Sequence, residues 1–157
     1  MPSNHVAGEW FGARRPYHGA VLGKRFIVDY GLQRRALLEE LRSGYRSTID
    51  VCDADQYLLR AAKFHGEPTA RTCPVCRRGK LVDLTHVFGD ELGQYSGRIK
   101  ASTELAELSR EHGEIRVYIV EVCQQCGWNH LVTSFLVGDG EPRRPPPRRR
   151  TVEDEYR

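Results

Sequence analysis

Two stretches in the first half of the chain show the three- and four-residue apolar spacing that is typical of amphipathic helices. In residues 26–42, arginines and glutamates alternate with the apolar side chains of Val28, Leu32, Ala36, Leu37 and Leu41. A serine and a glycine at 43–44 provide a stop for this helix. A second helix is predicted to begin after Asp53, a good N-cap residue, to run through residues 57–64, and to end at Gly66.

The second half of the chain alternates between strand signals and glycine-rich turns. Residues 81–88 are a strand candidate, and residues 102–112 are predicted to form a short helix after a loop with three glycines. Residues 115–122, rich in β-branched side chains, are the clearest strand, and residues 129–137 form another. The pattern predicts an α+β fold in which N-terminal helices pack on a small antiparallel sheet.

Both ends of the chain lack these periodicities. Residues 1–23 are rich in glycine and proline with scattered aromatic residues, which predicts a flexible N-terminal extension. Residues 139–157 consist mostly of glycine, proline, arginine and acids, which predicts a disordered Arg/Pro-rich tail. Residues 24–138 are therefore predicted to form a single domain.

Composition narrows the class of protein. With 157 residues, 39% hydrophobic and 29% charged, the chain fits one compact domain. Its apolar runs are far shorter than the roughly 20 residues of a membrane-spanning helix, and no secretory signal opens it, so we expect a cytoplasmic protein outside the membrane. A net charge of +3, from 24 Lys and Arg against 21 Asp and Glu, is too balanced to imply nucleic-acid binding by itself.

Four of the five cysteines form two Cys-x-x-Cys pairs, Cys73 with Cys76 and Cys123 with Cys126. Two such turns can supply the four tetrahedral thiolates of a structural Zn²⁺ site, and this pattern fits a metal site better than a disulfide framework. The second pair lies between the two predicted strands, so we expect a hairpin with a metal knuckle at its tip. The sequence therefore predicts a domain of helices plus a zinc ribbon, with zinc as its cofactor.

Other uses of these cysteines are less favoured. A redox dithiol needs a Cys-x-x-Cys pair at a helix N-terminus, and neither pair precedes a helical pattern. A catalytic zinc needs an open position, which four thiolates do not leave. No other catalytic motif stands out, so we expect no enzyme activity. The fifth cysteine, Cys52, is either a regulatory thiol or substitute ligand or, as we favour, a small buried residue beside a helix cap.

Three residues next to the cysteine turns are candidates for contacting a partner: Arg77, Arg78 and Trp128. The arginines either neutralise the formal −2 charge of a zinc–tetrathiolate cluster, with zinc +2 and four thiolates −4, or contact phosphate or an acidic partner. Trp128 either stacks on a partner or packs against the hairpin, and packing is favoured. For the arginines at 143–150, a solvated tail is favoured over nucleic-acid binding because acids follow them.

Two histidines in the predicted strands, His86 and His130, are alternatives to the thiolates as ligands. With four cysteines available, each is more simply a strand residue whose imidazole hydrogen-bonds locally. Gly127, directly after the last cysteine, is expected to adopt a left-handed backbone conformation. Arg77 occupies the equivalent place in the first pair.

Four motifs within Lys24–Gly138 together resemble an uncharacterised family, a domain of unknown function, of short actinobacterial zinc-ribbon-like proteins. The motifs are Asp53–Gly66, Cys73–Cys76, Val87–Gly93 and Val120–Leu131. The resemblance implies a bacterial cytoplasmic protein and carries no assigned activity.

The sequence favours two functions. The first is a non-catalytic interaction module for the transcription or translation machinery, with RNA polymerase, the ribosome or nucleic acid as partner, by analogy with other zinc ribbons. The second is a thiol-based redox or zinc-responsive regulator, in which an oxidant releases the metal from the thiolates. The sequence does not predict an oligomeric state.

Overall fold

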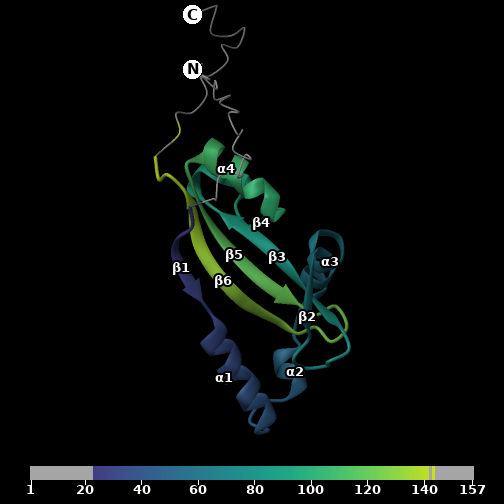
Figure 1. Ribbon diagram of the computed structural model, residues 1–157. Helices are drawn as coiled ribbons and strands as arrows, with labels where there is room; N and C mark the ends of the chain where they lie inside the picture. Colours follow the sequence, from purple (N-terminus) through teal and green to yellow (C-terminus); the bar gives the residue numbers. More distant parts are fainter. Residues whose placement is uncertain (1–22, 142, 144–157) are drawn as a thin grey trace, which may run out of the picture.

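The centre of the molecule is one six-stranded antiparallel sheet, seen in a computed structural model that describes residues 23–141 and 143 (Figure 1). Its strands are β1 (Arg25–Asp29), β2 (Glu67–Thr72), β3 (Lys80–Phe88), β4 (Arg98–Ile99), β5 (Glu114–Val122) and β6 (Asn129–Gly138). They are ordered β1-β6-β5-β3-β2, and the short β4 pairs with β3. The predicted α+β fold with a small antiparallel sheet is confirmed.

The β5–β6 hairpin is the longest paired element and fixes the position of the second cysteine turn. Its register runs from Glu114 opposite Gly138 to Val122 opposite Asn129, with an irregularity at Ile119/Val120. The six residues from Cys123 to Trp128 close the hairpin, as the sequence predicted. Strand β3 pairs with β5, so the first cysteine turn, between β2 and β3, comes to the same end of the sheet.

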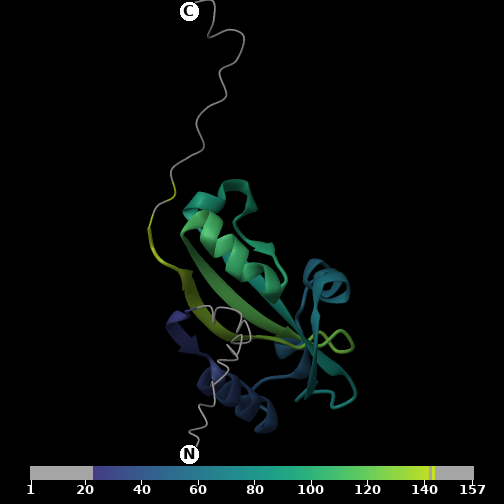
Figure 2. The same cartoon turned by 45° about the horizontal axis from the view of Figure 1, so that its top comes forward.

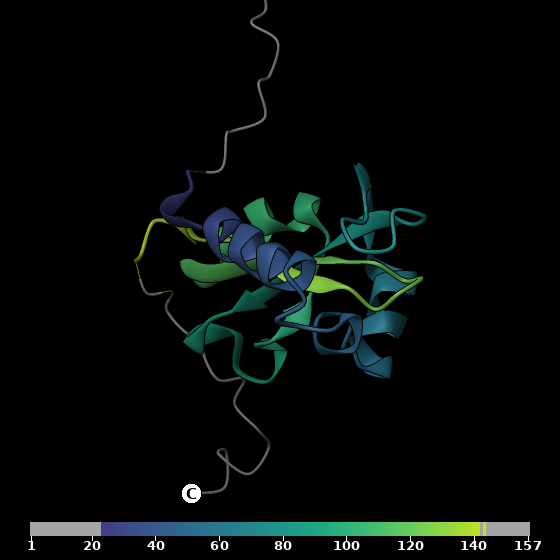
Figure 3. The same cartoon turned by 90° about the horizontal axis from the view of Figure 1, so that it is seen from below.

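Helices cover parts of both faces of the sheet. They are α1 (Gly31–Arg42), α2 (Thr48–Val51), α3 (Gln56–His65) and α4 (Leu105–His112), with 3-10 helices η1 (Asp90–Tyr95) and η2 (Ser102–Glu104). Figure 2 shows α4 lying over one face of the sheet, along β5. Figure 3 shows α1 from below, crossing in front of the sheet at the other end of the molecule. Among the described residues, no helix combines the length and apolar character needed to cross a membrane.

The alternation of side chains along β5 divides the core between these helices. Ile115 and Val117 pack with Leu105 of α4, whereas Val122 packs with Ala61 and Ala62 of α3. A third cluster lies at the cysteine end of the sheet and contains Cys73, Cys123, Trp128, Leu81, Val51 and Leu38. The sheet therefore has an apolar layer on each face and a separate cluster around the cysteine turns.

Two local expectations about the helices are wrong. The first helix does not begin at 26, because residues 25–29 form β1, which pairs with β6 before α1 starts at Gly31. Pairing with a long neighbouring strand outweighs the helical spacing of a short apolar run. The N-cap of α3 is Asp55, whose carboxylate accepts a 2.7 Å hydrogen bond from the Leu58 N–H, whereas Asp53 accepts one from the Asn129 side chain at 2.9 Å.

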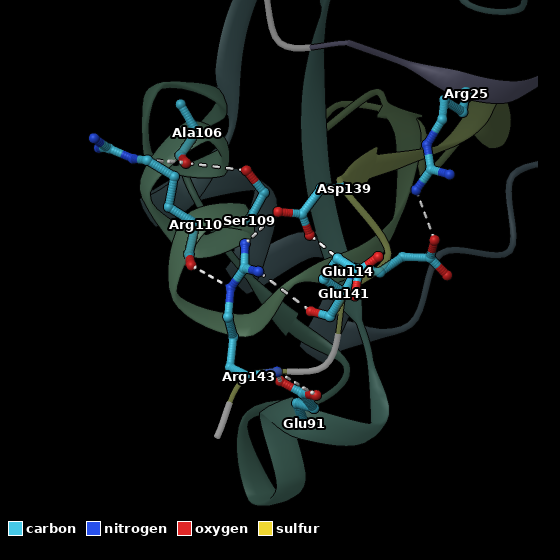
Figure 4. A network of polar contacts seen from close by, with 9 residues as sticks. All are labelled: Arg25, Glu91, Ala106, Ser109, Arg110, Glu114, Asp139, Glu141 and Arg143. Atoms are coloured by element: carbon cyan, nitrogen blue, oxygen red, sulfur yellow. Dashed lines mark hydrogen bonds and ion pairs between the residues drawn. The ribbon is translucent and has the colours of Figure 1, made fainter. Parts of the chain in front are cut away.

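The segment after β6 is held beside α4 and η1 by Arg143 (Figure 4). The Arg143 guanidinium donates to the Arg110 carbonyl oxygen at 2.8 Å and forms an ion pair with Asp139 at 2.8 Å. Its backbone N–H donates to the Glu91 carboxylate at 3.2 Å. These contacts bring the start of the predicted tail, residues 139–141 and 143, against the domain.

The predicted extension and tail otherwise lie outside the described residues. Of residues 1–23, only Gly23 is described, and residue 142 and residues 144–157 are not described. The aromatic residues of the predicted extension and the arginines at 144–150 lie outside the described residues, and the predicted domain boundaries stay predictions.

Candidate metal centre

The four paired cysteines meet in one cluster. Their sulfur atoms all lie within 4.8 Å of one another. Contacts between the two turns are short, with 3.6 Å between the sulfurs of Cys73 and Cys126 and 3.7 Å between those of Cys76 and Cys123. Cys73 and Cys123 are buried, and their partners are partly buried. The cluster could hold one metal ion.

The two cysteine turns share one backbone pattern. In the first, the Cys73 N–H donates to the Gly79 carbonyl at 2.8 Å, and the Arg77 N–H donates back to the Cys73 carbonyl at 3.1 Å. In the second, the Cys123 N–H donates to the Trp128 carbonyl at 2.8 Å, and the Gly127 N–H donates back to the Cys123 carbonyl at 2.9 Å. Each turn therefore folds tightly around its first cysteine and presents both sulfurs to one point.

Both residues that follow the turns adopt the left-handed conformation. Gly127 has φ +81° and Arg77 has φ +56°, so the predicted equivalence of the two positions is confirmed. Glycine adopts this region freely, whereas a residue with a Cβ atom has a steric cost there. At Gly127, a Cβ would also approach the Cys52 carbonyl oxygen to 3.0 Å.

We expect Gly127→Ala to lower the free energy of unfolding by about 2 kcal/mol, because left-handed strain costs about 1–2 kcal/mol and the contact with Cys52 adds to it. Gly44→Ala is the matched control, since Gly44 has φ +78° and open space around its Cβ position. Urea unfolding of both variants measures the difference. Equal losses would show that the approach to Cys52 carries no cost.

Backbone N–H groups point at the sulfur atoms. Burial opposes ionisation of Cys76, but the N–H groups of Arg78 and Gly79 donate to its sulfur and help lower its pKa to about 6. Burial raises the pKa of Cys73 to about 12, although N–H groups donate to this sulfur as well. Burial likewise raises the pKa of Cys126 to about 12. A cation among the sulfurs would favour their ionised form, and metal uptake would then release protons.

Cys52 lies at the border of the cluster without being one of the four. It precedes the N-terminus of α3 and packs against the same apolar cluster. Burial raises the pKa of the Cys52 thiol. The Ala54 N–H donates to the Gly127 carbonyl at 3.0 Å and fastens this segment to the second turn.

The buried carboxylate of Glu121 supports the second cysteine turn through a hydrogen bond with Trp128. Glu121 on β5 is fully buried, and its carboxylate accepts from Arg34 of α1 at 2.6 Å, from Arg71 of β2 at 2.8 Å and from the Trp128 indole N–H at 2.9 Å. Arg71 also pairs with Asp83 of β3. Because a buried charge is costly without partners, this network ties α1 and β2 to the base of the cysteine turn.

The residues singled out beside the cysteines separate into two groups. Arg77 and Arg78 are exposed at the first turn. Trp128 is fully buried and stacks on His130, with ring centroids 5.8 Å apart. Its side chain is therefore not available to a partner, and packing against the hairpin is its observed role. The supporting residue that our sequence reasoning missed is Glu121, whose signal is a lone charge inside the apolar run from Val117 to Val122.

Comparison with known proteins identifies a family and several relatives. Residues 21–152 match the model of DUF5318, which is described as a family of unknown function. The uncharacterised proteins Rv0049 of Mycobacterium tuberculosis and Mb0050 of Mycobacterium bovis are each 49% identical to the chain over 119 residues, covering 76% of this chain and 87% of theirs. No solved structure matches the chain.

Proposed function

The chain belongs to this DUF5318 family, as its motifs predicted, and we propose that it is a non-catalytic protein with a structural zinc site that serves as an interaction module for the transcription or translation machinery. The observation that carries the proposal is the four-cysteine cluster, which joins two separate parts of the sheet. We place the protein in the cytoplasm, where thiol pairs stay reduced and available to a metal.

The spacing of the sulfur atoms supports zinc. A tetrahedral zinc site with Zn–S bonds of about 2.3 Å has sulfur atoms about 3.8 Å apart along each edge. The two contacts between the cysteine turns, 3.6 Å and 3.7 Å, are close to this edge. Zinc with four thiolates is a closed structural site, because no coordination position remains for water or substrate. In this role Cys73, Cys76, Cys123 and Cys126 hold the ion, and the ion holds the two turns together.

The exposed arginines support an interaction role for the metal end of the molecule. Arg77 and Arg78 project from the first turn, next to a cluster that would carry a formal −2 charge. Neither arginine is in an ion pair with a described carboxylate. They are therefore free to meet an acidic surface of RNA polymerase, or the phosphates of the ribosome or of another nucleic acid.

A crosslinked pull-down from cells tests this proposal. We expect the full-length protein to recover RNA polymerase subunits or ribosomal proteins, and Arg77→Ala/Arg78→Ala to reduce this recovery severalfold. Arg35→Ala/Arg42→Ala, which changes two exposed arginines of α1, is the matched control. Recovery of neither machinery by the wild-type protein would contradict the proposal.

A second candidate, a thiol-based redox or zinc-responsive regulator, rests on the place of Cys52, which packs against the apolar cluster around the four paired cysteines. Hydrogen peroxide would oxidise the Cys52 thiol and one of the four clustered thiols to a disulfide and be reduced to two waters, and the metal would lose one ligand. We expect mild peroxide to release zinc from the wild-type protein faster than from Cys52→Ala. Full retention of zinc by the wild-type protein would exclude this candidate.

A further inference from the structure

The sheet face that carries α3 also has two adjoining hollows, away from the cysteine cluster. The first, of about 750 Å³, lies between α3 and β4 and is bordered by Tyr57, Arg60, Phe64 and Arg98, among others. The second, of about 670 Å³, lies over β3, β5 and β6 and is bordered by Phe88, Tyr118 and His86, among others. The two hollows adjoin because Ile99, which borders the first hollow, is the cross-strand partner of His86, which borders the second.

Aromatic side chains stand open to solvent along this surface. Tyr57 is 77% exposed, Phe64 is 68% exposed and Phe88 is 40% exposed. Phe88 packs edge to face against Tyr118, with centroids 5.4 Å apart, so the pair is a rigid rim for the second hollow. Isolated exposed apolar residues are common, but several aromatic residues around adjoining hollows mark a binding surface.

The charges on this surface have one sign. Arg60 and Arg98 are exposed, and neither forms an ion pair with a described carboxylate. Among the described residues that line the two hollows, none is an aspartate or a glutamate. Arg98 also stacks on Tyr95, with its guanidinium carbon 4.8 Å from the ring centroid. The surface therefore combines aromatic faces with unpaired cations.

A buried hydrogen-bonding atom adds a third feature. The Nδ1 atom of His86 is buried without a hydrogen-bond partner in the described part of the chain, and His86 borders the second hollow. Burial also lowers the pKa of His86, which favours the neutral imidazole.

We propose that this aromatic–basic surface, formed by Tyr57, Arg60, Phe64, Phe88, Arg98 and Tyr118, binds single-stranded nucleic acid. Aromatic faces accept unstacked bases of any sequence, and arginines between them neutralise the phosphate backbone. A duplex hides the faces of its bases, so it would not use the aromatic residues. The inference rests on the proposed interaction function and names its partner chemistry.

Fluorescence anisotropy with the full-length, metal-loaded protein tests the inference. The probes are labelled oligouridine RNA and oligothymidine DNA of about 12 nucleotides, at roughly 50 mM salt, with unlabelled duplex DNA as a competitor. We expect one or both single strands to bind and the duplex to compete poorly. The two probes tell RNA from DNA.

Paired variants locate the binding surface. Tyr57→Ala/Arg60→Ala should raise Kd at least about tenfold, because the loss of one stacked base alone weakens binding by about 5- to 150-fold. Tyr45→Ala/Arg42→Ala is the matched control, since Tyr45 is 81% exposed outside this surface, and should change Kd less than about twofold. Metal content and melting temperature must match the wild type in both variants.

Three results would overturn the inference: no binding of either single strand, preference for the duplex, or equal weakening by the two double variants. If the pull-down still recovers polymerase or ribosomal proteins while the oligonucleotides do not bind, the inference fails and the interaction function stands. If the pull-down recovers neither machinery while the single strands bind through this surface, the interaction function fails and the inference survives.

Discussion

Replacing Cys123 by Ser is expected to remove the cooperative thermal unfolding transition and most of the sheet signal in circular dichroism. Cys123 is fully buried at the end of β5, and its sulfur lies 3.7 Å from that of Cys76 in the other turn. A structural zinc site contributes on the order of 10 kcal/mol in small metal-dependent modules, as much as the whole stability of a typical domain. Loss of one ligand should therefore cost most of the fold.

Cys52→Ala is the matched control for this variant. Cys52 contacts the same cluster but is not one of the four cysteines that could hold the metal, so we expect its loss to cost about 1 kcal/mol and to leave metal content unchanged. A Cys123→Ser protein with native circular dichroism and an unchanged melt would contradict the structural role of the cluster.

Glu121→Gln is expected to lower the free energy of unfolding by about 3 kcal/mol, which corresponds to a large drop in melting temperature for a domain of this size. The Glu121 carboxylate is fully buried and pairs with both Arg34 and Arg71, so a neutral amide leaves Arg34 without a counter-charge and leaves Arg71 with Asp83 alone. The amide can also place an N–H group against these donors. Chemical denaturation of the metal-loaded protein measures the loss.

Glu114→Gln provides the comparison for the Glu121 variant. Glu114 pairs with Arg25 at 2.7 Å, but both side chains are more than two-fifths exposed, at 43% and 41%. Exposed ion pairs contribute about 0–1 kcal/mol because water and salt screen them. If the two glutamine variants lose the same stability, the buried network does not hold the base of the cysteine turn.

The cysteine cluster and the central hairpin could be predicted because their signals are local. The spacing within Cys73–Cys76 and Cys123–Cys126 is itself the geometry of two ligand turns, and the β-branched run of β5 leads directly into the second turn. Gly127 also signals its own left-handed conformation. These features need no knowledge of the rest of the chain.

The edge strands could not be predicted because their pairing partners are distant in sequence. β1 pairs with β6, more than 100 residues further along the chain, and its apolar residues also fit a helical spacing. β2 contains Pro68 and few apolar residues, so it has no strand pattern, and it forms as an edge of the sheet beside β3. Both edge strands form because of pairing with distant residues, and a short stretch of sequence carries no information about that pairing.

The network around Glu121 shows the same limit at the level of side chains. A single glutamate within β5 gives no indication that Arg34 and Arg71, from two other elements, converge on it. The same limit applies to His86 and His130, for which the sequence predicts the same local hydrogen bonding. The Nδ1 atom of His130 meets the Leu131 carbonyl at 2.6 Å, a local contact of the predicted kind, whereas Nδ1 of His86 has no described partner.

The most direct test of a structural zinc site is metal content per chain by elemental analysis, combined with thermal melts before and after a strong chelator. The four-cysteine cluster predicts about one zinc per chain and loss of the melting transition on chelation. A protein without bound zinc, with a melt that the chelator does not change, would contradict the account and leave the two cysteine pairs as candidates for redox chemistry.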